Sequence, residues 1–505
     1  MTDTMPQVYP TVLHMVAAAA AAVPERLALQ CGTETLNYRD YAACIAGFAA
    51  ELGPEVRGAR VAVLMANSLD VAIAIYAVAA AGAQLVPLNP AYTMHELEPI
   101  LLDADPIAIV CDAGLESAVG AWATRIGIRR CIAVGTGKRL TDWRASHLSI
   151  QSFPAPESLA LLQYTGGTTG RAKGVNLTHA AISTNVAQRE ALLPSADGER
   201  ILAVTPLYHS YAMAMGLHLA SYCRGTLTTL PRYHPKDALE TIARERITLF
   251  AGSPNLFVGL MGHADFDATD FSSLKLCFSG ASALPVETLR RWEQATGCGI
   301  CEGYGQTEAG PVLTYNPHHG VRKIGSVGVP LPLTEVEIVD AENGRTALPI
   351  GEAGEIRARG PQIMAGYRNR PEETAAALRD GWLYTGDIGV FDADGYLFIR
   401  DRKKDMVIVS GFNVYPREIE EVLCKHADVV EAAVIGVCDS YRGEILRAFV
   451  VPAKAAKVTA DDLLTYLQER LTKYKIPAQI VVTATLPKTG VGKIDKVTLR
   501  AEPFS

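Results

Sequence analysis

Short, largely apolar runs recur along the first half of the chain and are separated by stretches with helical periodicity. The runs are residues 60–65, 84–88, 107–111, 201–205, 249–252 and 274–278. A continuous apolar run predicts a strand buried on both faces, as in a parallel sheet that helices cover. Residues 70–81 carry helical spacing and predict one such helix. The alternation of strands and helices therefore predicts parallel α/β sheets.

The pattern changes near Gly325. Residues 335–339, 354–359 and 395–400 alternate apolar and polar positions, and Gly and Pro lie between them. This alternation is typical of antiparallel strands with one face toward solvent. We therefore expect an antiparallel β subdomain after the α/β region.

A charged stretch, Lys403-Lys404-Asp405, separates the β subdomain from a compact tail. The tail is predicted to contain helices at 416–426 and 460–471 and strands at 429–435 and 447–451. We predict an α/β protein of two domains. Residues 1–402 form a large N-terminal domain of two parallel α/β sheets plus the β subdomain, and residues 403–505 form a small α+β C-terminal domain.

The composition agrees with a globular protein of more than one domain. The chain has 505 residues, of which 49% are hydrophobic and 20% are charged, and its formal net charge is −7. This charge argues against a nucleic-acid partner. The Ala-rich run at 15–23 precedes the first basic residue, Arg26, so we interpret it as a helix and not as a signal peptide. No apolar run is long enough for a transmembrane segment, and we expect a cytoplasmic protein.

Ten cysteines are scattered along the chain, and two of them, Cys298 and Cys301, form a C-x-x-C pair. A chain of this length does not depend on a disulfide framework, and a lone pair without a histidine cluster is weak support for a metal or redox site. We expect both cysteines to pack in the core.

The segment Tyr164-Thr-Gly-Gly-Thr-Thr-Gly-Arg-Ala-Lys-Gly174 is the most informative motif. Its glycines allow a tight turn whose backbone amides point at an anion. Hydroxyls of three threonines and the charge of Lys173 add further donors, so the segment predicts a polyphosphate-binding loop. Ala172 precedes the lysine and Gly174 follows it, which is not the spacing of the common P-loop.

With this loop in place, the whole chain resembles the adenylate-forming superfamily of acyl-CoA synthetases, luciferases and peptide-synthetase adenylation domains. Six further segments match its motifs in the right order: 206–210, 303–308, 384–387, 401–405, 410–416 and 487–493. Many relatives have Ser at the position of Gly166 and Pro at that of Ala172, but the backbone donors remain. The motifs are most similar to the bacterial fatty acyl-CoA ligase branch.

The resemblance implies ATP, Mg²⁺ and CoA as the cofactor and co-substrates. It implies that Tyr304 contacts adenine and that Thr307 lies near the α-phosphate. Asp387 and Arg402 would bind the ribose, and Glu308 and Thr165 would bind the metal. The ATP-binding set is Thr165, Gly166, Gly167, Thr168, Thr169, Gly170, Lys173, Gly280, Ala281, Tyr304, Thr307, Asp387 and Arg402. Physically, an aromatic ring can stack on a purine, and a carboxylate oxygen is a ligand that suits Mg²⁺.

The resemblance also assigns roles in catalysis. Lys493 bridges two anions when the carboxylate of the acid attacks the α-phosphorus, and His209 positions the acid. The C-terminal domain is mobile and rotates about a hinge at Lys404, which withdraws Lys493 and brings Ser410 and Gly411 to the thiol path. Acetylation of Lys493 by a lysine acetyltransferase would remove the charge.

The acid is expected to bind in a pocket of small and apolar residues. The candidates are His209, Met213, Ala214, Ser253, Gly280, Ala281, Gly303, Gly305 and Val312. Since none of them is Arg or Lys, a second carboxylate is disfavoured, and a fatty or other apolar monocarboxylic acid is favoured. An aryl-acid CoA ligase and a stand-alone enzyme that loads a carrier protein stay open as alternatives, as does a homodimer.

Overall fold

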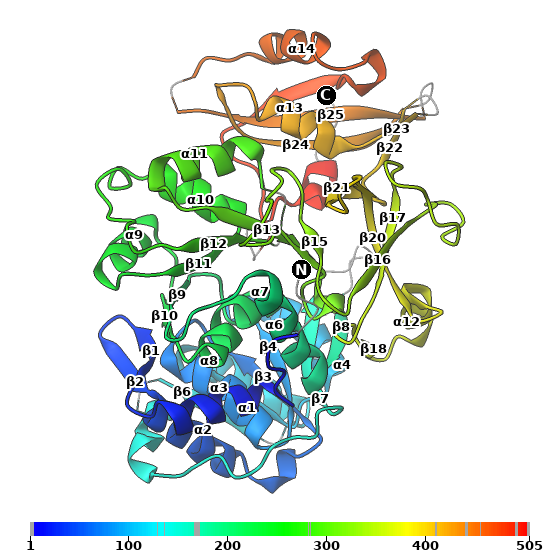
Figure 1. The fold of residues 1–505 in the computed structure, drawn as a ribbon. Coiled ribbons are helices and arrows are strands. Elements are labelled where there is room, and N and C mark those ends of the chain that lie inside the picture. The colour runs from blue at the N-terminus through cyan, green and yellow to red at the C-terminus, as the bar shows by residue number, and fades with distance from the viewer. Residues whose placement is uncertain are drawn as a thin grey trace.

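The computed structural model describes residues 5–128, 130–135, 137–165, 172–280, 282, 284–409, 412–439, 443–454, 456–489 and 493–501. Four sheets make up the fold. Two mainly parallel sheets form the larger part, an antiparallel sheet lies beside them, and the C-terminal sheet covers one end (Figure 1). Among the described helices, none has both the length and the apolar character that crossing a bilayer requires.

The first parallel sheet has seven strands. In spatial order they are β18 (Gly366–Tyr367), β8 (Lys173–Thr178), β7 (Leu159–Thr165), β4 (Gln84–Leu88), β3 (Arg60–Leu64), β5 (Ala108–Asp112) and β6 (Arg130–Val134). The strands from β7 to β6 are parallel, whereas β8 pairs antiparallel with β7. Strand β4 is buried along its whole length, as its continuous apolar run predicts.

The second sheet has nine strands. In spatial order they are β15 (Val329–Pro330), β14 (Thr314–Tyr315), β13 (Ile300–Tyr304), β12 (Leu276–Ser279), β11 (Leu249–Gly252), β9 (Arg200–Ala203), β10 (Thr226–Thr229), β1 (Leu27–Cys31) and β2 (Glu34–Asn37). Its centre is parallel, and β2, β14 and β15 add antiparallel edges. Register pairs Phe278 with Cys301 and Ser279 with Glu302.

The antiparallel sheet and the C-terminal sheet have five strands each. The former contains β16 (Glu335–Val339), β17 (Gly354–Arg359), β19 (Leu378–Arg379), β20 (Trp382–Phe391) and β21 (Leu397–Arg402). The latter contains β22 (Val407–Val409), β23 (Phe412–Val414), β24 (Val429–Asp439), β25 (Gly443–Pro452) and β26 (Gln479–Val482). Strand β26 runs parallel to β25, while the other pairs of both sheets are antiparallel.

Helices cover the faces of the sheets. They are α1 (Val12–Ala22), α2 (Tyr38–Leu52), α3 (Leu69–Ala80), α4 (Met94–Ala104), α5 (Glu116–Arg125), α6 (His179–Leu192), α7 (Ser210–Ala212), α8 (Leu219–Tyr222), α9 (Pro235–Arg244), α10 (Pro254–Met261), α11 (Val286–Thr296), α12 (Pro371–Ala377), α13 (Pro416–Leu423), α14 (Ala460–Gln468) and α15 (Lys496–Ala501). Helix α3 is apolar all round and touches strands of both parallel sheets, as a helix between two sheets must. One hydrophobic cluster therefore unites the two sheets.

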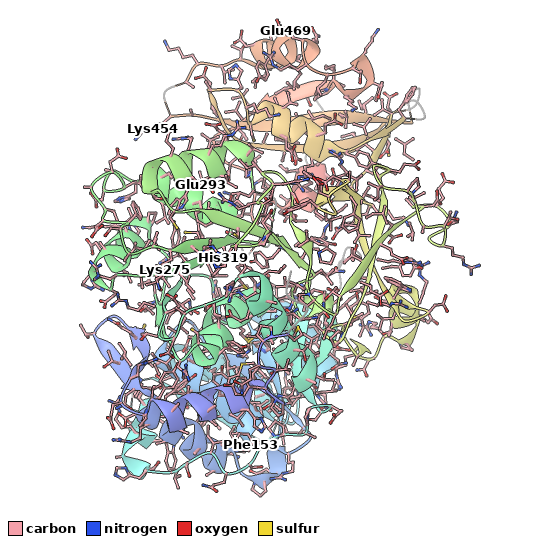
Figure 2. All side chains as sticks on the ribbon, viewed as in Figure 1. Phe153, Lys275, Glu293, His319, Lys454 and Glu469 are labelled. Carbon is pink, nitrogen blue, oxygen red and sulfur yellow. The ribbon has the colours of Figure 1, made fainter. Side chains whose placement is uncertain are left out.

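Side chains fill the spaces between these layers (Figure 2). A second apolar cluster, built around Trp292, lies between the nine-stranded sheet and the helices α9 to α11. Cys298 belongs to it and Cys301 to the larger cluster, so both cysteines pack in the core, as their isolated C-x-x-C pair predicts. Lys275, labelled in Figure 2, holds Glu199 by a 2.9 Å ion pair at the start of β12.

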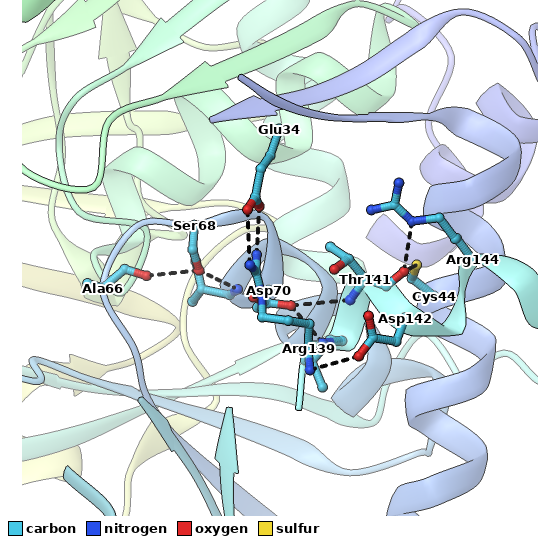
Figure 3. A network of polar contacts seen from close by, with 11 residues as sticks. Glu34, Cys44, Ala66, Ser68, Asp70, Arg139, Thr141, Asp142 and Arg144 are labelled. Atoms are coloured by element: carbon cyan, nitrogen blue, oxygen red, sulfur yellow. Dashed lines mark hydrogen bonds and ion pairs between the residues drawn. The ribbon is translucent and has the colours of Figure 1, made fainter. Parts of the chain in front are cut away.

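A polar network fastens the short helix η3 (Leu140–Ser146) to the N-terminal part of the fold (Figure 3). The buried Asp70 accepts hydrogen bonds from the backbone amides of Leu140 (2.7 Å) and Thr141 (3.2 Å). Arg139 donates to Asp70 through Nε at 2.6 Å and to both oxygens of Glu34. This network satisfies a buried carboxylate completely, which is the condition for burying it at low cost.

The fold class predicted from the sequence is confirmed. The strands expected from apolar runs are present within a few residues of the predicted bounds, the central ones are parallel, and β16, β17 and β21 are antiparallel. The expected first helix is α1, and the expected tail helices are α13 and α14. Strands β24 and β25 extend beyond their predicted ends because they form a long hairpin.

Candidate active site

The candidate site lies where β12 and β13 end and where the antiparallel sheet meets the C-terminal sheet. Strand β13 ends at Tyr304, and the short helix η5 (Thr307–Ala309) follows it and carries Glu308. Ligands of parallel α/β sheets bind at this carboxyl edge, beyond the ends of the strands.

The buried Asp387, the partly buried Tyr304 and the exposed Arg402 form a polar group at this edge. Asp387 and Arg402 face each other in the register of β20 and β21, and Arg402 Nε lies 3.4 Å from Asp387 Oδ1. The Tyr304 hydroxyl donates to Asp387 Oδ2 at 2.7 Å. Burial raises the pKa of Asp387, while the charge of Arg402 and the Tyr304 hydroxyl lower it. The sequence motifs therefore bring the three predicted nucleotide-binding residues together.

Lys493 reaches the same place from the C-terminal region. Its backbone amide donates to Thr489 Oγ1 at 3.2 Å, and its carbonyl accepts from the Thr489 amide at 2.7 Å, so both backbone groups of Lys493 are paired with Thr489. Burial and then the charge of Arg402 lower the pKa of Lys493, whereas Asp387 and Glu308 raise it. The ammonium therefore lies within electrostatic reach of all three groups.

Glu308 and Lys173 share one neighbour, Tyr367. The Tyr367 hydroxyl donates to Glu308 Oε1 at 2.9 Å, and the Lys173 ammonium lies 5.2 Å from the centre of the Tyr367 ring. Lys173 also forms a 2.5 Å ion pair with Glu373 of α12. Thr165 pairs with Lys173 in the register of β7 and β8. A single carboxylate such as Glu308 fits Mg²⁺, because this ion takes most of its other ligands from phosphate and water.

His209 begins α7 and turns its ring back on the helix. Its Nδ1 accepts from the Tyr211 amide at 3.2 Å. Burial, with a further contribution from the charge of Lys493, lowers the pKa of His209 to about 4. The imidazole is therefore neutral near pH 7. It suits a positioning role and not that of a group that must carry a charge.

Three predicted pocket glycines lie against other groups so closely that a side chain would clash. A Cβ on Gly280 would lie 2.7 Å from the Tyr211 ring, and one on Gly303 would lie 2.7 Å from the Tyr315 ring. A Cβ on Gly305 would lie 2.0 Å from the Pro311 carbonyl oxygen. Met213 and Ala214 line a cavity of about 10 Å³ nearby. The glycines therefore let aromatic rings form the wall of the predicted acid site.

Several predicted site residues lie outside the described part of the chain: Gly166, Gly167, Thr168, Thr169, Gly170, Ala281, Ser410 and Gly411. Lys404 is described, and burial lowers its pKa. Among the described residues, no group of three or more His, Cys, Asp or Glu side chains is arranged to hold a metal ion, so the metal prediction rests on Glu308 and the phosphates.

Sequence reasoning missed four residues that the structure places here: Tyr367, Glu373, Tyr211 and Arg189. Tyr367 and Glu373 hold Glu308 and Lys173 from a short strand and a short helix that carry no motif. Tyr211 lies two residues after His209, so its position next to a predicted site residue was an available signal. Arg189 offered no signal, because a charged residue at a helix end is ordinarily exposed.

Lys493 is half-buried, and the carboxylates of Glu308, suited to a metal, and Asp387, suited to a ribose, both act on it. This arrangement matches one chemical task. It can hold two anions together while they react, as a nucleotide-dependent ligase must. A family model described as AMP-binding enzyme matches residues 16–368, and that of the AMP-binding enzyme C-terminal domain matches residues 418–493.

Known proteins are similar to this chain over nearly its whole length. A long-chain-fatty-acid–CoA ligase of Bacillus subtilis (strain 168) is 37% identical over 523 residues, which cover 96% of this chain and 93% of that protein. Crystal structures of MatB from Rhodopseudomonas palustris cover 97% of this chain and 98% of MatB. The ATP-bound form has a TM-score of 0.89 at 32% identity, and the apo form has 0.79 at 31% identity.

The chain belongs to the AMP-binding enzyme family. It is an acid–thiol ligase of the AMP-forming type, which forms an acyl-CoA with ATP, Mg²⁺ and CoA.

Proposed function

We propose that the acid is a monocarboxylic acid with an apolar body, and that Lys493 catalyses its activation in the arrangement seen here. The observation that carries the proposal is the position of Lys493, whose charge acts on His209 at the predicted acid site and is itself affected by Glu308 and Asp387 at the nucleotide site. The B. subtilis relative, named for long-chain fatty acids, supports an apolar acid.

In the first half-reaction, a carboxylate oxygen of the acid attacks the α-phosphorus of ATP, and pyrophosphate leaves with the electron pair of the broken P–O bond. Lys493 lowers the repulsion between the two anions, and His209 positions the acid. Asp387 and Arg402 hold the ribose, and Tyr304 supports adenine. Thr307 lies at the α-phosphate, and Lys173 with residues 165–170 holds the other phosphates. Mg²⁺, held by Glu308 with Thr165, would neutralise phosphate charge.

In the second half-reaction, the CoA thiol attacks the acyl carbonyl, its proton goes to solvent, and AMP leaves. The thiol needs the space that Lys493 occupies in the first arrangement. We propose that residues 403–505 rotate about Lys404, so that Ser410 and Gly411 come to the thiol path. The greater similarity to ATP-bound MatB than to apo MatB, at nearly equal identity, supports an arrangement suited to the first half-reaction.

The function is tested with ATP, Mg²⁺ and CoA and a panel of short, medium and long fatty acids, aryl acids and dicarboxylates, with products resolved by mass. A thioester with AMP from an apolar monocarboxylic acid is expected. Acyl-adenylate without thioester would move the assignment to carrier-protein loading, and preference for a dicarboxylate would contradict the apolar pocket.

The hinge is tested with Lys404→Pro, which restricts the backbone at the pivot. The variant is expected to form acyl-adenylate at the normal rate and to lose thioester formation. Lys403→Ala is the matched control, because Lys403 holds Glu355 by a 2.8 Å ion pair next to the same pivot. Normal turnover of the complete reaction by Lys404→Pro would exclude this hinge.

Three further assignments complete the proposal. Acetylation of Lys493 would stop adenylation, because it removes the ammonium charge. We place the protein in the cytoplasm, and we propose a homodimer, which sedimentation at several protein concentrations would test.

A further inference from the structure

Behind the predicted acid site lies a buried group of hydrogen-bond donors, formed by Arg189, Tyr211 and Tyr315. Their exposed fractions are 2%, 7% and 1%. Among the described residues, no partner has hydrogen-bond geometry at Arg189 Nε or Nη2 or at either phenol hydroxyl, although the two hydroxyls lie close enough to affect each other's pKa. Buried donors without acceptors are rare in folded proteins and mark strain or a place where a ligand binds. We call these three residues the donor cluster.

Strand geometry places the donor cluster next to the pocket glycines. Side chains two residues apart on a strand share a face and are about 7 Å apart. Phe278 therefore shares a face with Gly280, and Cys301, opposite Phe278, shares one with Gly303. The Tyr211 ring lies against Gly280, and the Tyr315 ring lies against Gly303.

The guanidinium of Arg189, which belongs to α6, packs over the Phe278 ring on the same face of the sheet. Its guanidinium carbon lies 4.5 Å from the centre of the Phe278 ring, and the Phe278 and Tyr315 ring centres are 6.4 Å apart. Burial raises the pKa of both phenols. The contact between the two hydroxyls raises the pKa of Tyr211 and lowers that of Tyr315, and the charge of Arg189 lowers the pKa of each, so the guanidinium acts on both hydroxyls. Tyr211 connects the predicted acid site to the donor cluster, because its backbone amide donates to His209 Nδ1 and its ring lies against Gly280.

The positive charge of Arg189 is already paired with the carboxylate of Glu190. Its Nη1 contacts Glu190 and lies 3.2 Å from Ser195 Oγ. Glu190 in turn accepts from the Ser195 amide and hydroxyl, both at 2.9 Å. A carboxylate brought to the donor cluster would therefore add an unmatched buried charge, which is costly. A neutral oxygen acceptor would satisfy the free donors without that cost, since a guanidinium can only donate.

We propose that the donor cluster binds a neutral oxygen at the far end of the acid, so that the preferred substrate has an apolar body and ends in a hydroxyl, carbonyl or ether group. This inference rests on the proposed function, because it takes the glycine-lined wall as the acid site. It makes Tyr211, Tyr315 and Arg189 specificity-determining residues. A methyl-ended acid would leave the same donors buried and unpaired, which is how polar sites reject apolar analogues.

The test compares acids in pairs that differ only by a terminal methyl or hydroxyl group, over short, medium and long chains, together with 4-methyl- and 4-hydroxycinnamic acids. The readout is kcat/KM for acid-dependent ATP–pyrophosphate exchange, which reports adenylation alone. At the length that fits, the hydroxyl-ended acid is expected to be better by about tenfold or more. The matching dicarboxylate should be worse than the hydroxyl-ended acid. Equal or better activity of the methyl-ended acid at every length would overturn the inference.

Variants then assign the preference to these residues. Tyr211→Phe and Tyr315→Phe each remove one hydroxyl of this pair, so thermal stability should change little while the hydroxyl-to-methyl ratio falls toward one. Loss of stability with an unchanged ratio would show a purely structural role and overturn the assignment. Arg189→Gln combined with Glu190→Gln removes both charges and should also lower the ratio.

Tyr233→Phe is the matched control. The Tyr233 hydroxyl lies 3.4 Å from the Leu256 carbonyl oxygen, and its ring packs on the separate cluster around Trp292, so its removal should leave the ratio unchanged. The outcomes also separate the two proposals. Exchange without thioester formation would contradict the ligase function, whereas the ratio would still report on the donor cluster.

Discussion

The proposed nucleotide side and the proposed acid side of the site differ in how their polar side chains are paired. On the nucleotide side, Asp387 has Tyr304 and Arg402, and Lys173 has Glu373. On the acid side, two tyrosine hydroxyls and two guanidinium nitrogens have no hydrogen-bond partner among the described residues. The nucleotide side is therefore kept in place by contacts within the protein, and we infer that the acid supplies the missing partners on the other side.

This difference matches what each side must recognise. Every turnover uses the same nucleotide, so its groups can be positioned in advance by mutual contacts. The acid is the variable substrate, and a site built with unpaired donors discriminates strongly against acids that lack an acceptor. The four predictions that follow test the contrast, beginning with the largest expected effect.

Replacing Lys493 tests the point where the two sides meet. Lys493→Ala should lower the rate of ATP–pyrophosphate exchange by about 10²- to 10³-fold, since it removes the cation that we assign to the space between the two anions. Thioester formation from preformed acyl-adenylate should continue. Lys488→Ala, which removes an ion pair with Glu431 from the same segment, should have little effect on either step. Equal loss in both half-reactions would contradict the assignment of Lys493 to the first.

Asp387 tests the preformed nucleotide side. Asp387→Asn keeps the shape but loses the carboxylate that the Tyr304 hydroxyl and Arg402 hold. Steady-state kinetics should show KM for ATP raised by about ten- to hundredfold, because a hydrogen bond to a charged group is lost. KM for the acid should change little. If KM for the acid rose instead and KM for ATP did not, the ribose assignment would be wrong.

Glu302 lies on β13 between the two sides, on the face opposite Gly303. Burial raises the pKa of this carboxyl from 4.5 to about 7, while the charge of Arg417 and the Leu284 amide, at 2.9 Å, lower it. Because the folded pKa is the higher one, the folded state binds the extra proton. The contribution of Glu302 to the free energy of unfolding is therefore fully present below pH 4.5 and is lost as the pH rises through 7. The loss is on the order of 3 kcal/mol.

Urea unfolding across this pH range measures the effect. Glu302→Gln should remove the fall in stability contributed by this group, and the exposed Glu335→Gln on β16 should keep it. The same slope in the Glu302→Gln variant as in the unaltered protein would show that another group is responsible.

The ion pair between Lys173 and Glu373 gives the smallest expected effect. The Glu373 carboxylate pairs with the Lys173 ammonium, which would otherwise be free to bind the phosphates of ATP. Both side chains are partly exposed. Glu373→Gln should therefore lower KM for ATP by about two- to fivefold. Glu372→Gln, on the neighbouring position of α12, is the control. A rise in KM for ATP would mean that Glu373 positions Lys173 and does not compete for it.

The sequence predicted the fold well because two simple patterns specify it. Largely apolar runs such as 84–88 are typical of strands buried on both faces, and alternating runs such as 354–359 are typical of antiparallel strands. The polar motifs also predicted which nucleotide-site residues would meet, since Asp387 and Arg402 lie on strands joined by one short turn.

The acid side could not be predicted in the same way. Arg189, Tyr211 and Tyr315 come from a helix end, a short helix and the second strand from one edge of the nine-stranded sheet, and only the packing of that sheet brings them together. The pocket residues named from the motifs contain no Arg or Lys. Arg189 lies behind those pocket residues, on helix α6, which none of the motifs includes.

The central claim, that the acid is activated as an acyl-adenylate, is tested most directly by supplying an acid whose carboxylate carries a heavy oxygen isotope, with ATP, Mg²⁺ and CoA. The attacking oxygen stays on the α-phosphorus when the thiol displaces AMP. Mass spectrometry should therefore find one heavy oxygen in AMP and none in pyrophosphate. Heavy oxygen in inorganic phosphate, with ADP as the nucleotide product, would mean attack on the terminal phosphate and would contradict the account.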